Sequence, residues 1–436
     1  MGLALNADTG DVVWETRVPG AVFATVSVDQ GVVYAFVSRV GAPLLVALDA
    51  QTGRIEWSTT VDHQPGSDAV SSPVVYEGLV WVGVSGTAAE TSADDRTAFE
   101  GSSVLVATKT LRAPEFSPVD AEHPTGRIAT YRAGDIVRKL YTIPPRIWQH
   151  GYAGGSQWGT MAIDPRSGYG YEGTGNPFDY HAEYKTTNAV IKIDLDRQRH
   201  TFGELVGSYK GNVEEYAPVA SQKAPCDAVD HVSGVFAAGL ECVRLDLDFG
   251  ATPNLLRVGG RLVVAAGQKS GVLHFFDGRT MRPIAKTVVG VPSQVGGVVG
   301  SPATDGHHLY GPHTIGGYLW SVDATTHGVQ WLSPTADGVH WGPPVTYANH
   351  VLYTVDLSGC LDAFDAGTGA PLMHLPMQVG SDEATLTNPP LSWGGVTVAR
   401  HLVFASVGVG LASAGLSSMP DGFVIAYAPL TALERP

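Results

Sequence analysis

The sequence repeats one short pattern: an apolar strand, an Asn or Asp, a Thr-Gly turn, and a Trp eight residues after the Asn or Asp. The clearest copies lie at 3–14 and 46–57. Further copies have their Asp or Tyr at Asp323, Asp365, Asp194, Asp277, Tyr131 and Tyr427, which makes eight closing strands. Neighbouring clear copies are 42 to 46 residues apart, a spacing typical of four-stranded propeller blades.

Two further apolar runs precede most copies, for example 72–76 followed by 79–83. Four short strands per unit predict an all-β propeller in one domain, 1–436, with a stacked β-solenoid as the alternative. The Asp side chain is expected to cap each turn, Gly to take the positive φ, and Trp to pack between neighbouring blades. Insertions at about 107–125 and 205–245 are expected to be loops on one rim.

The number of repeats predicts an unfinished blade. The eight closing strands are preceded by only seven sets of further strands, so the first blade is expected to be N-terminally incomplete. The chain is then either an eight-bladed propeller that lacks its first strands, or an incomplete, seven-plus-bladed one in which the first strand completes another blade of a seven-bladed ring. The opening segment 1–10 is typical of a strand end and its turn, and it has neither the basic nor the apolar region of a secretory signal.

Composition narrows the function. Hydrophobic residues make up 44% of the chain and charged residues 16%, which excludes a disordered chain. The formal net charge of -15 argues against a nucleic-acid partner. No apolar run is long enough to predict a membrane span. Of the three cysteines, Cys226 and Cys242 flank a polar stretch and are able to pair, while Cys360 is expected to be a buried free thiol.

Three motifs carry candidate chemistry. They are Gly154-Gly155-Ser156-Gln157-Trp158-Gly159 with Thr174-Gly175-Asn176-Pro177 downstream, Asp246-Leu247-Asp248-Phe249-Gly250 with Gln268-Lys269-Ser270-Gly271 downstream, and His340-Trp341-Gly342-Pro343. In their order and spacing, together with the repeats, they resemble the pyrroloquinoline-quinone (PQQ)-dependent alcohol dehydrogenases. The likeness is greatest to the polyvinyl-alcohol-dehydrogenase-like branch and extends over nearly the whole chain. It implies a quinoprotein-type propeller that binds PQQ and Ca²⁺.

The resemblance implies a cofactor site. Trp158 matches the Trp on which the quinone stacks, with Ser156 and Trp341 at further cofactor contacts. Lys269 matches the basic residue that polarises the quinone carbonyls and stabilises charge developing on them. The alternative for Trp158 is an ordinary inter-blade Trp, and for Lys269 a hairpin cation.

The resemblance also implies a calcium site and a catalytic base. Asn176 and Glu90 match calcium ligands, which suits an ion that prefers oxygen donors. Asp248 matches both a metal-site residue and the catalytic base that takes the alcohol proton. The alternatives are a turn residue for Asn176, a solvated loop acid for Glu90 and a turn cap for Asp248. The family pairing of cysteines agrees with a Cys226–Cys242 disulfide.

The sequence departs from the family pattern in several places. Relatives carry an adjacent Cys pair and an Arg before the first repeat, where this chain has not yet begun. Val298 replaces an Asn near the quinone, and Glu100 stands where a basic or amide side chain is expected. These departures weaken the expected hold on the cofactor.

Two hypotheses follow from these residues. One is an enzyme that oxidises an alcohol, polyvinyl alcohol or another secondary alcohol, and passes electrons to a separate acceptor such as a cytochrome c. Its full-length form is expected in the periplasm or outside the cell. The other is a non-catalytic propeller that serves as a protein-interaction scaffold. The joint presence of Trp158, Asn176, Asp248 and Lys269 favours the enzyme, because a scaffold does not need them together.

Overall fold

The computed structural model describes residues 2–90, 99–117, 124–178, 184–211, 247–291, 297–314, 317–335, 344–356, 359–377, 394–407 and 423–428. The chain divides into two compact units, Met1–Leu255 with Phe276–Pro283, and Leu256–Phe275 with Ile284–Pro436. Cys226, Cys242 and Trp341 lie outside the described residues, so their predicted roles stay predictions.

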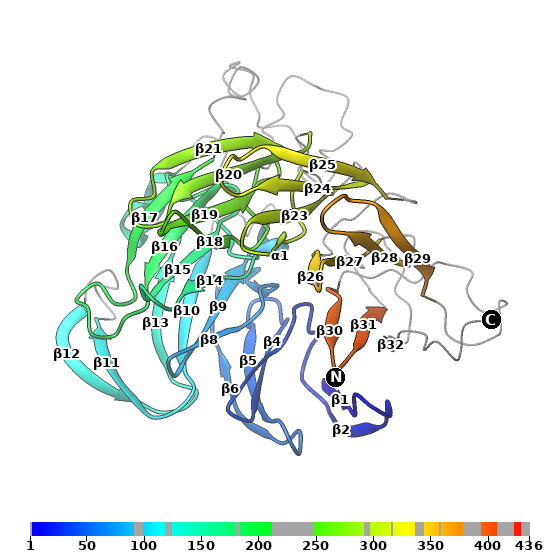
Figure 1. Ribbon diagram of the computed structural model, residues 1–436. Coiled ribbons are helices and arrows are strands. Elements are labelled where there is room, and N and C mark those ends of the chain that lie inside the picture. Colours follow the sequence, from blue (N-terminus) through cyan, green and yellow to red (C-terminus); the bar gives the residue numbers. More distant parts are fainter. Residues whose placement is uncertain are drawn as a thin grey trace, which may run out of the picture. The chain divides into compact units, whose positions relative to one another are not determined.

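The first unit holds an N-terminal hairpin and three larger antiparallel sheets (Figure 1). The hairpin is β1 (Gly2–Leu5) and β2 (Val12–Thr16). The first sheet is β3 (Ser27–Asp29), β4 (Val32–Val37), β5 (Leu44–Asp49) and β6 (Ile55–Thr60). The second is β7 (Asp68–Ala69), β8 (Val74–Tyr76), β9 (Leu79–Ser85), β10 (Ser102–Ala107) and β13 (Ile136–Tyr141). The third is β14 (Ala162–Asp164), β15 (Tyr169–Gly173), β16 (Ala189–Asp194) and β17 (Leu205–Lys210). Two short helices, α1 (Thr87–Glu90) and the 3₁₀ helix η2 (Pro145–His150), lie in connections.

Four more sheets follow along the chain, mostly within the second unit. They are β18 (Asn254–Val258), β19 (Arg261–Gly267), β20 (Val272–Asp277) and β21 (Pro283–Val288); β22 (Ala303–Thr304), β23 (His308–His313), β24 (Tyr318–Asp323) and β25 (Val329–Pro334); β26 (Thr346–Ala348), β27 (Val351–Val355), β28 (Cys360–Asp365) and β29 (Pro371–Pro376); and β30 (Thr397–Ala399), β31 (Leu402–Val407) and β32 (Phe423–Tyr427).

These sheets are propeller blades. In each four-stranded sheet the strands are paired in chain order, because each strand turns back directly on the one before it. Within the described residues, seven sheets have three to five strands each, and two further sheets are two-stranded hairpins. The predicted all-β propeller is therefore confirmed, with seven blades among the described residues. That the hairpin of β1 and β2 belongs to an incomplete first blade stays a prediction.

The repeat builds its turns as predicted. After β5, the Asp49 carboxylate accepts hydrogen bonds from Thr52, from its amide at 2.8 Å and its hydroxyl at 2.7 Å. The hydroxyl bond, followed by the amide bond, lowers the pKa of Asp49. Gly53 then takes a φ of 70°, in the region that other residues disfavour. Asp365, Thr368 and Gly369 repeat this geometry after β28.

The repeat tryptophans contact the turn of the next sheet. The indole nitrogen of Trp14 in β2 donates to the carbonyl of Ala50, 2.9 Å away, and a Cβ at Gly53 would lie 2.6 Å from the same indole. Trp331 in β25 likewise donates to Ala366 at 3.1 Å. A side chain at the turn glycine would therefore collide with the tryptophan.

Two predicted boundaries are wrong. The insertion expected as a loop at 107–125 forms a hairpin, β11 (Leu111–Phe116) with β12 (Pro124–Tyr131). Its residues Leu111 and Ala113 are buried in an apolar cluster, which holds it in place. Tyr131, which the repeat pattern placed at the end of a closing strand, lies in this hairpin. In the second sheet the position of that strand, between β9 and β13, is taken by β10. The insertion expected from residue 205 begins with strand β17, because 205–210 pairs with β16.

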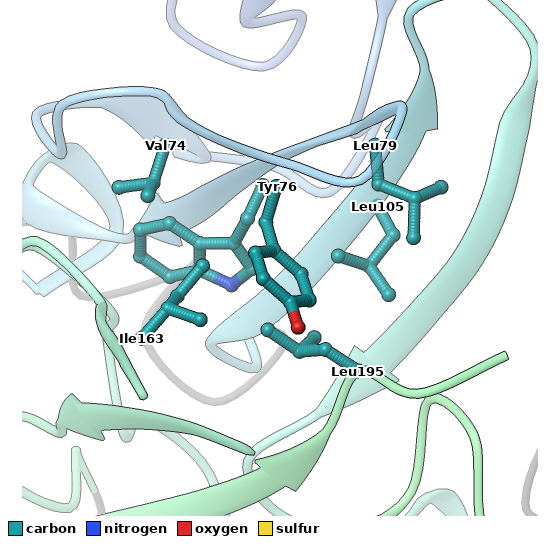
Figure 2. A pocket seen from close by; sticks show the side chains of 7 residues that line it. Val74, Tyr76, Leu79, Leu105, Ile163 and Leu195 are labelled. Carbon is teal, nitrogen blue, oxygen red and sulfur yellow. The ribbon is translucent and has the colours of Figure 1, made fainter. Parts of the chain in front are cut away.

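Apolar side chains fill the seam between the second and third sheets (Figure 2). A narrow hollow there is lined almost wholly by apolar atoms, from Val74, Tyr76, Leu79, Trp81, Leu105, Ile163 and Leu195. We interpret the hollow as packing between sheets, since it offers a ligand few polar groups. In the part of the chain that the structure describes, no helix has the length and apolar character to cross a membrane.

Candidate active site

The predicted site residues of the first unit lie at equivalent connections. Trp158 precedes β14 and Asp248 precedes β18, so both enter the first strand of a sheet. Asn176 follows β15, which pairs with β14, and Glu90 follows β9, which pairs with β7 and β8. Because adjacent strands are antiparallel, the start of one strand and the end of its neighbour lie at the same end of the sheet. The local topology therefore places each of these residues at the corresponding end of its own sheet.

Hydrogen bonds of the backbone and of the Ser156 hydroxyl join three of these connections. The Ser156 hydroxyl oxygen accepts from the amide of Gly86 at 3.1 Å, and the Ser156 carbonyl accepts from the amide of Gly175 at 2.8 Å. The neighbouring Gln157 amide donates to the Val84 carbonyl at 3.1 Å. Ser156 is buried, so its hydroxyl acts here as a link between the segments that carry Glu90 and Asn176.

The indole nitrogen of Trp158 donates to the Asp248 carboxylate, with Nε1 3.0 Å from Oδ2. Asp248 is buried at 4% exposure, while Trp158 is half-buried. The chain passes close beneath the indole at Gly250, where a Cβ would lie 1.9 Å from Trp158 Cη2. Only glycine fits there, so the Asp248-Phe249-Gly250 sequence both supports the ring and presents the carboxylate to it.

Asn176 and Glu90 form the second pair of the site. The Asn176 amide nitrogen donates to Glu90 Oε1 at 2.9 Å. Asn176 is buried and Glu90 is half-buried at the end of α1. Because this hydrogen bond uses the amide nitrogen of Asn176, the side-chain carbonyl oxygen of Asn176 is the atom that can act as a metal ligand. Phe249 joins this pair to the first, since its amide donates to the carbonyl of Thr174 at 3.4 Å.

Two buried carboxyl groups lie in the same unit as these residues. Glu172 in β15 is fully buried, and neither carboxyl oxygen has a hydrogen-bond partner among the described residues. Its Oε1 lies 3.3 Å from the place of a Cβ on Gly159, the residue after Trp158. Burial raises the pKa of Glu172 well above its usual value. The sequence marks Glu172 only as a lone acid within a short strand pattern.

Glu100 is the second buried carboxyl group. It is 2% exposed, and burial raises its pKa to about 9, so it is neutral at pH 7. Its backbone is fixed by Gln64, which accepts from the Glu100 amide and donates to its carbonyl, each at 2.9 Å. Gln64 in turn bonds to Asp62, which is paired with Lys139. The acid found by sequence where a basic or amide group was expected is therefore held as an uncharged side chain.

Lys269 belongs to the second unit. It is buried at 8% exposure, in the tight turn from Gln268 to Gly271 between β19 and β20. Val298 packs nearby, because a Cβ on Gly267 would lie 2.3 Å from its side chain. The structure thus groups Ser156, Trp158, Asn176, Glu90 and Asp248 in the first unit, and Lys269 stands in the other.

Comparisons with known proteins agree with this fold. The family model of the outer membrane protein assembly factor BamB matches residues 3–95. Among solved structures, a quinohemoprotein alcohol dehydrogenase from Pseudomonas putida HK5 has a TM-score of 0.62 at 16% identity, covering 94% of this chain and 67% of that one. A europium-containing methanol dehydrogenase has a TM-score of 0.64 at 15% identity, covering 94% and 79%. The fold is therefore that of a quinoprotein-type β-propeller.

Two sequence relatives are both polyvinylalcohol dehydrogenases. A polyvinylalcohol dehydrogenase from a Pseudomonas species is 28% identical over 281 residues, which are 63% of this chain and 39% of that protein. Another polyvinylalcohol dehydrogenase, from Sphingopyxis sp. (strain 113P3), is 25% identical over 292 residues, with the same shares of the two chains. The matched region thus spans about two fifths of each relative. The predicted resemblance to PQQ-dependent alcohol dehydrogenase-like propellers is confirmed.

Proposed function

We propose that this chain is the propeller of a PQQ- and calcium-dependent dehydrogenase that oxidises an alcohol. The observation that carries the proposal is the Trp158–Asp248 hydrogen bond, which joins a half-buried aromatic ring to a buried carboxylate. The named activity of the two sequence relatives supports the same class of reaction. Polyvinyl alcohol or another secondary alcohol is the proposed substrate.

The residues fit the two cofactors. Glu90, Asn176 and Asp248 offer carboxylate and amide oxygens, the donors that Ca²⁺ prefers. Asn176 already donates its amide nitrogen to Glu90, which leaves its carbonyl oxygen as the ligand atom. The Trp158 indole offers an aromatic face for a planar quinone. Lys269 is proposed to hold the quinone oxygens, and Trp341 to make a further cofactor contact.

In the proposed mechanism, PQQ would supply the acceptor for the hydride of the alcohol carbon. The Asp248 carboxylate removes the hydroxyl proton as general base. The Trp158 N–H fixes Oδ2 of this carboxylate in direction, and the 4% exposure of Asp248 limits access of water. Electrons then leave to a separate acceptor such as a cytochrome c. The net charge of -15 suits a basic partner, and a periplasmic or extracellular full-length form belongs to the same proposal.

The test is reconstitution with PQQ and Ca²⁺, followed by dye reduction with simple alcohols and with polyvinyl alcohol. We expect saturable PQQ binding, and we expect Asp248→Asn to abolish turnover while PQQ binding persists. Asp11→Asn, a change of an exposed acid, is the control and should leave turnover unchanged. Turnover retained in Asp248→Asn would refute the assigned base.

A scaffold without catalysis is the second candidate. The match of 3–95 to the BamB family model favours it, and so does a BamB structure from Moraxella catarrhalis with a TM-score of 0.52 at 14% identity. Absence of saturable PQQ binding would favour the scaffold over the enzyme.

A further inference from the structure

A cluster of side chains of the types that can ligate a metal ion lies in the sheet of β26 to β29, in the second unit. One ligand atom each from Asp356, Cys360 and His374 lies within 4.8 Å of the others. Asp356 follows β27, Cys360 begins β28 and His374 lies in β29, so the cluster joins three consecutive segments of one sheet. Cys360 is buried and forms no disulfide.

Strand pairing explains the grouping. Asp362 is paired with His374 across β28 and β29, and residues two apart in a strand point to the same face. Cys360, Asp362 and His374 therefore share one face of the sheet. Two hydrogen bonds bring Asp356 to Cys360: the Asp356 amide donates to the Cys360 carbonyl at 3.1 Å, and the Cys360 amide donates to Asp356 Oδ1 at 2.9 Å.

The repeat does not require these side chains. In three other sheets the same register position pairs Val46 with Ser58, Ile191 with Ser208, and Trp320 with Leu332. Here it pairs a buried Asp with a His, whose Nδ1 lies 2.7 Å from Asp362 Oδ1. The hydrogen bond from the Cys360 amide uses one oxygen of Asp356. It gives no reason for a thiol at position 360 or for a histidine at position 374.

We propose that Asp356, Cys360 and His374 bind a divalent transition-metal ion, Zn²⁺ before others, with Asp362 orienting the histidine. A thiolate, an imidazole and a carboxylate are the donor types that Zn²⁺ takes, whereas Ca²⁺ and Mg²⁺ select oxygen alone. A carboxylate on one imidazole nitrogen while the other binds metal is the usual support for a ligating histidine.

His374 gives the ion a way in. Asp356, Asp362 and Cys360 are buried, but the side chain of His374 is 35% exposed. An ion can therefore reach the cluster from solvent past the imidazole. Three protein ligands leave a fourth tetrahedral position for water, as in open zinc sites.

The experiment measures metal on the full chain, with no quinone present. After chelation and dialysis against Zn²⁺, we expect one more zinc per chain in the wild type than in His374→Gln, by elemental analysis. His307→Gln, an exposed histidine of the same unit, is the control and should bind as the wild type does. Asp362→Asn should weaken zinc affinity by about 10- to 100-fold. Equal zinc content in the wild type and His374→Gln would overturn the proposal.

Cobalt substitution reports on the thiol. Co²⁺ bound by Cys360 should give a thiolate-to-cobalt absorption band that Cys360→Ser abolishes, while circular dichroism confirms that the variant is folded. A band that persists in folded Cys360→Ser, or no band in the wild type, would overturn the assignment. Because neither readout depends on PQQ or on turnover, the zinc site can stand or fall separately from the proposed dehydrogenase.

Discussion

Glu100→Gln should make the protein more stable at neutral pH and remove part of its pH dependence. Burial raises the pKa of Glu100 from 4.5 to about 9. Below pH 4.5 the folded and unfolded chains both carry the proton, and Glu100 has no effect on stability. Between pH 4.5 and 9 the unfolded chain loses the proton and the folded chain keeps it, so the free energy of unfolding falls as pH rises.

The size of the effect follows from the two pKa values. Each pH unit in this window costs about 1.4 kcal/mol, so Glu100 lowers the free energy of unfolding by about 3 kcal/mol at pH 7. A glutamine is uncharged in both states and avoids this loss. Glu172 adds its own pH dependence, but wild type and variant share it, and it cancels in their difference.

Urea unfolding at pH 5 and pH 7 tests the reasoning. The stability gap between Glu100→Gln and the wild type should widen by a few kcal/mol from the lower to the higher pH. Glu15→Gln, a change of an exposed acid, should show a constant gap. If the gap for Glu100→Gln is the same at both pH values, Glu100 ionises normally in the folded protein and the argument fails.

Three further predictions concern a turn, the candidate site and a buried histidine. Gly53→Ala should destabilise the protein by about 2 kcal/mol or more in urea unfolding, because it adds a collision with an indole to the strain of positive φ; Gly31→Ala has φ of 82° and open space, so it should show the strain alone. Trp158→Phe keeps an aromatic face but loses the bond to Asp248, so kcat for dye reduction by the loaded enzyme should fall about 10- to 100-fold with PQQ affinity nearly unchanged. Burial, aided by the charge of a nearby lysine, lowers the pKa of His274 to about 3. The free energy of unfolding should therefore fall by about 2 kcal/mol from pH 6.5 to 5, because only the unfolded chain takes up the proton. Denaturant titrations at both pH values should show that His274→Phe removes this pH dependence.

The blades could be predicted from sequence because their turns are local. Asp49, Thr52 and Gly53 hold each other within five residues, so the same letters produce the same geometry wherever they recur. The hairpin β11–β12 could not be predicted this way. Its place depends on the burial of Leu111 and Ala113 against side chains far away in the chain, which a local pattern does not contain.

The candidate site was predicted in part for a related reason. Trp158, Asn176 and Asp248 stand in motifs whose order is informative, and the structure bonds Trp158 to Asp248 and Asn176 to Glu90. Glu172 shows the limit of such reading. Its surroundings come from several strands, and only the folded chain reveals a carboxyl group with no hydrogen-bond partner among the described residues.

Two repeat tryptophans touch the turn of the following repeat: Trp14 touches Ala50 and Gly53, and Trp331 touches Ala366. If one sheet is removed as a whole, its tryptophan loses the turn of the next sheet that it contacts. Its own turn in the same way loses the tryptophan of the preceding sheet. Chimaeras that exchange blades between propellers should be cut inside a sheet, so that each indole travels with the glycine that accommodates it. The segment of chain to exchange therefore runs from the tryptophan of one blade to the turn glycine of the next blade, and not from the first to the last strand of one blade.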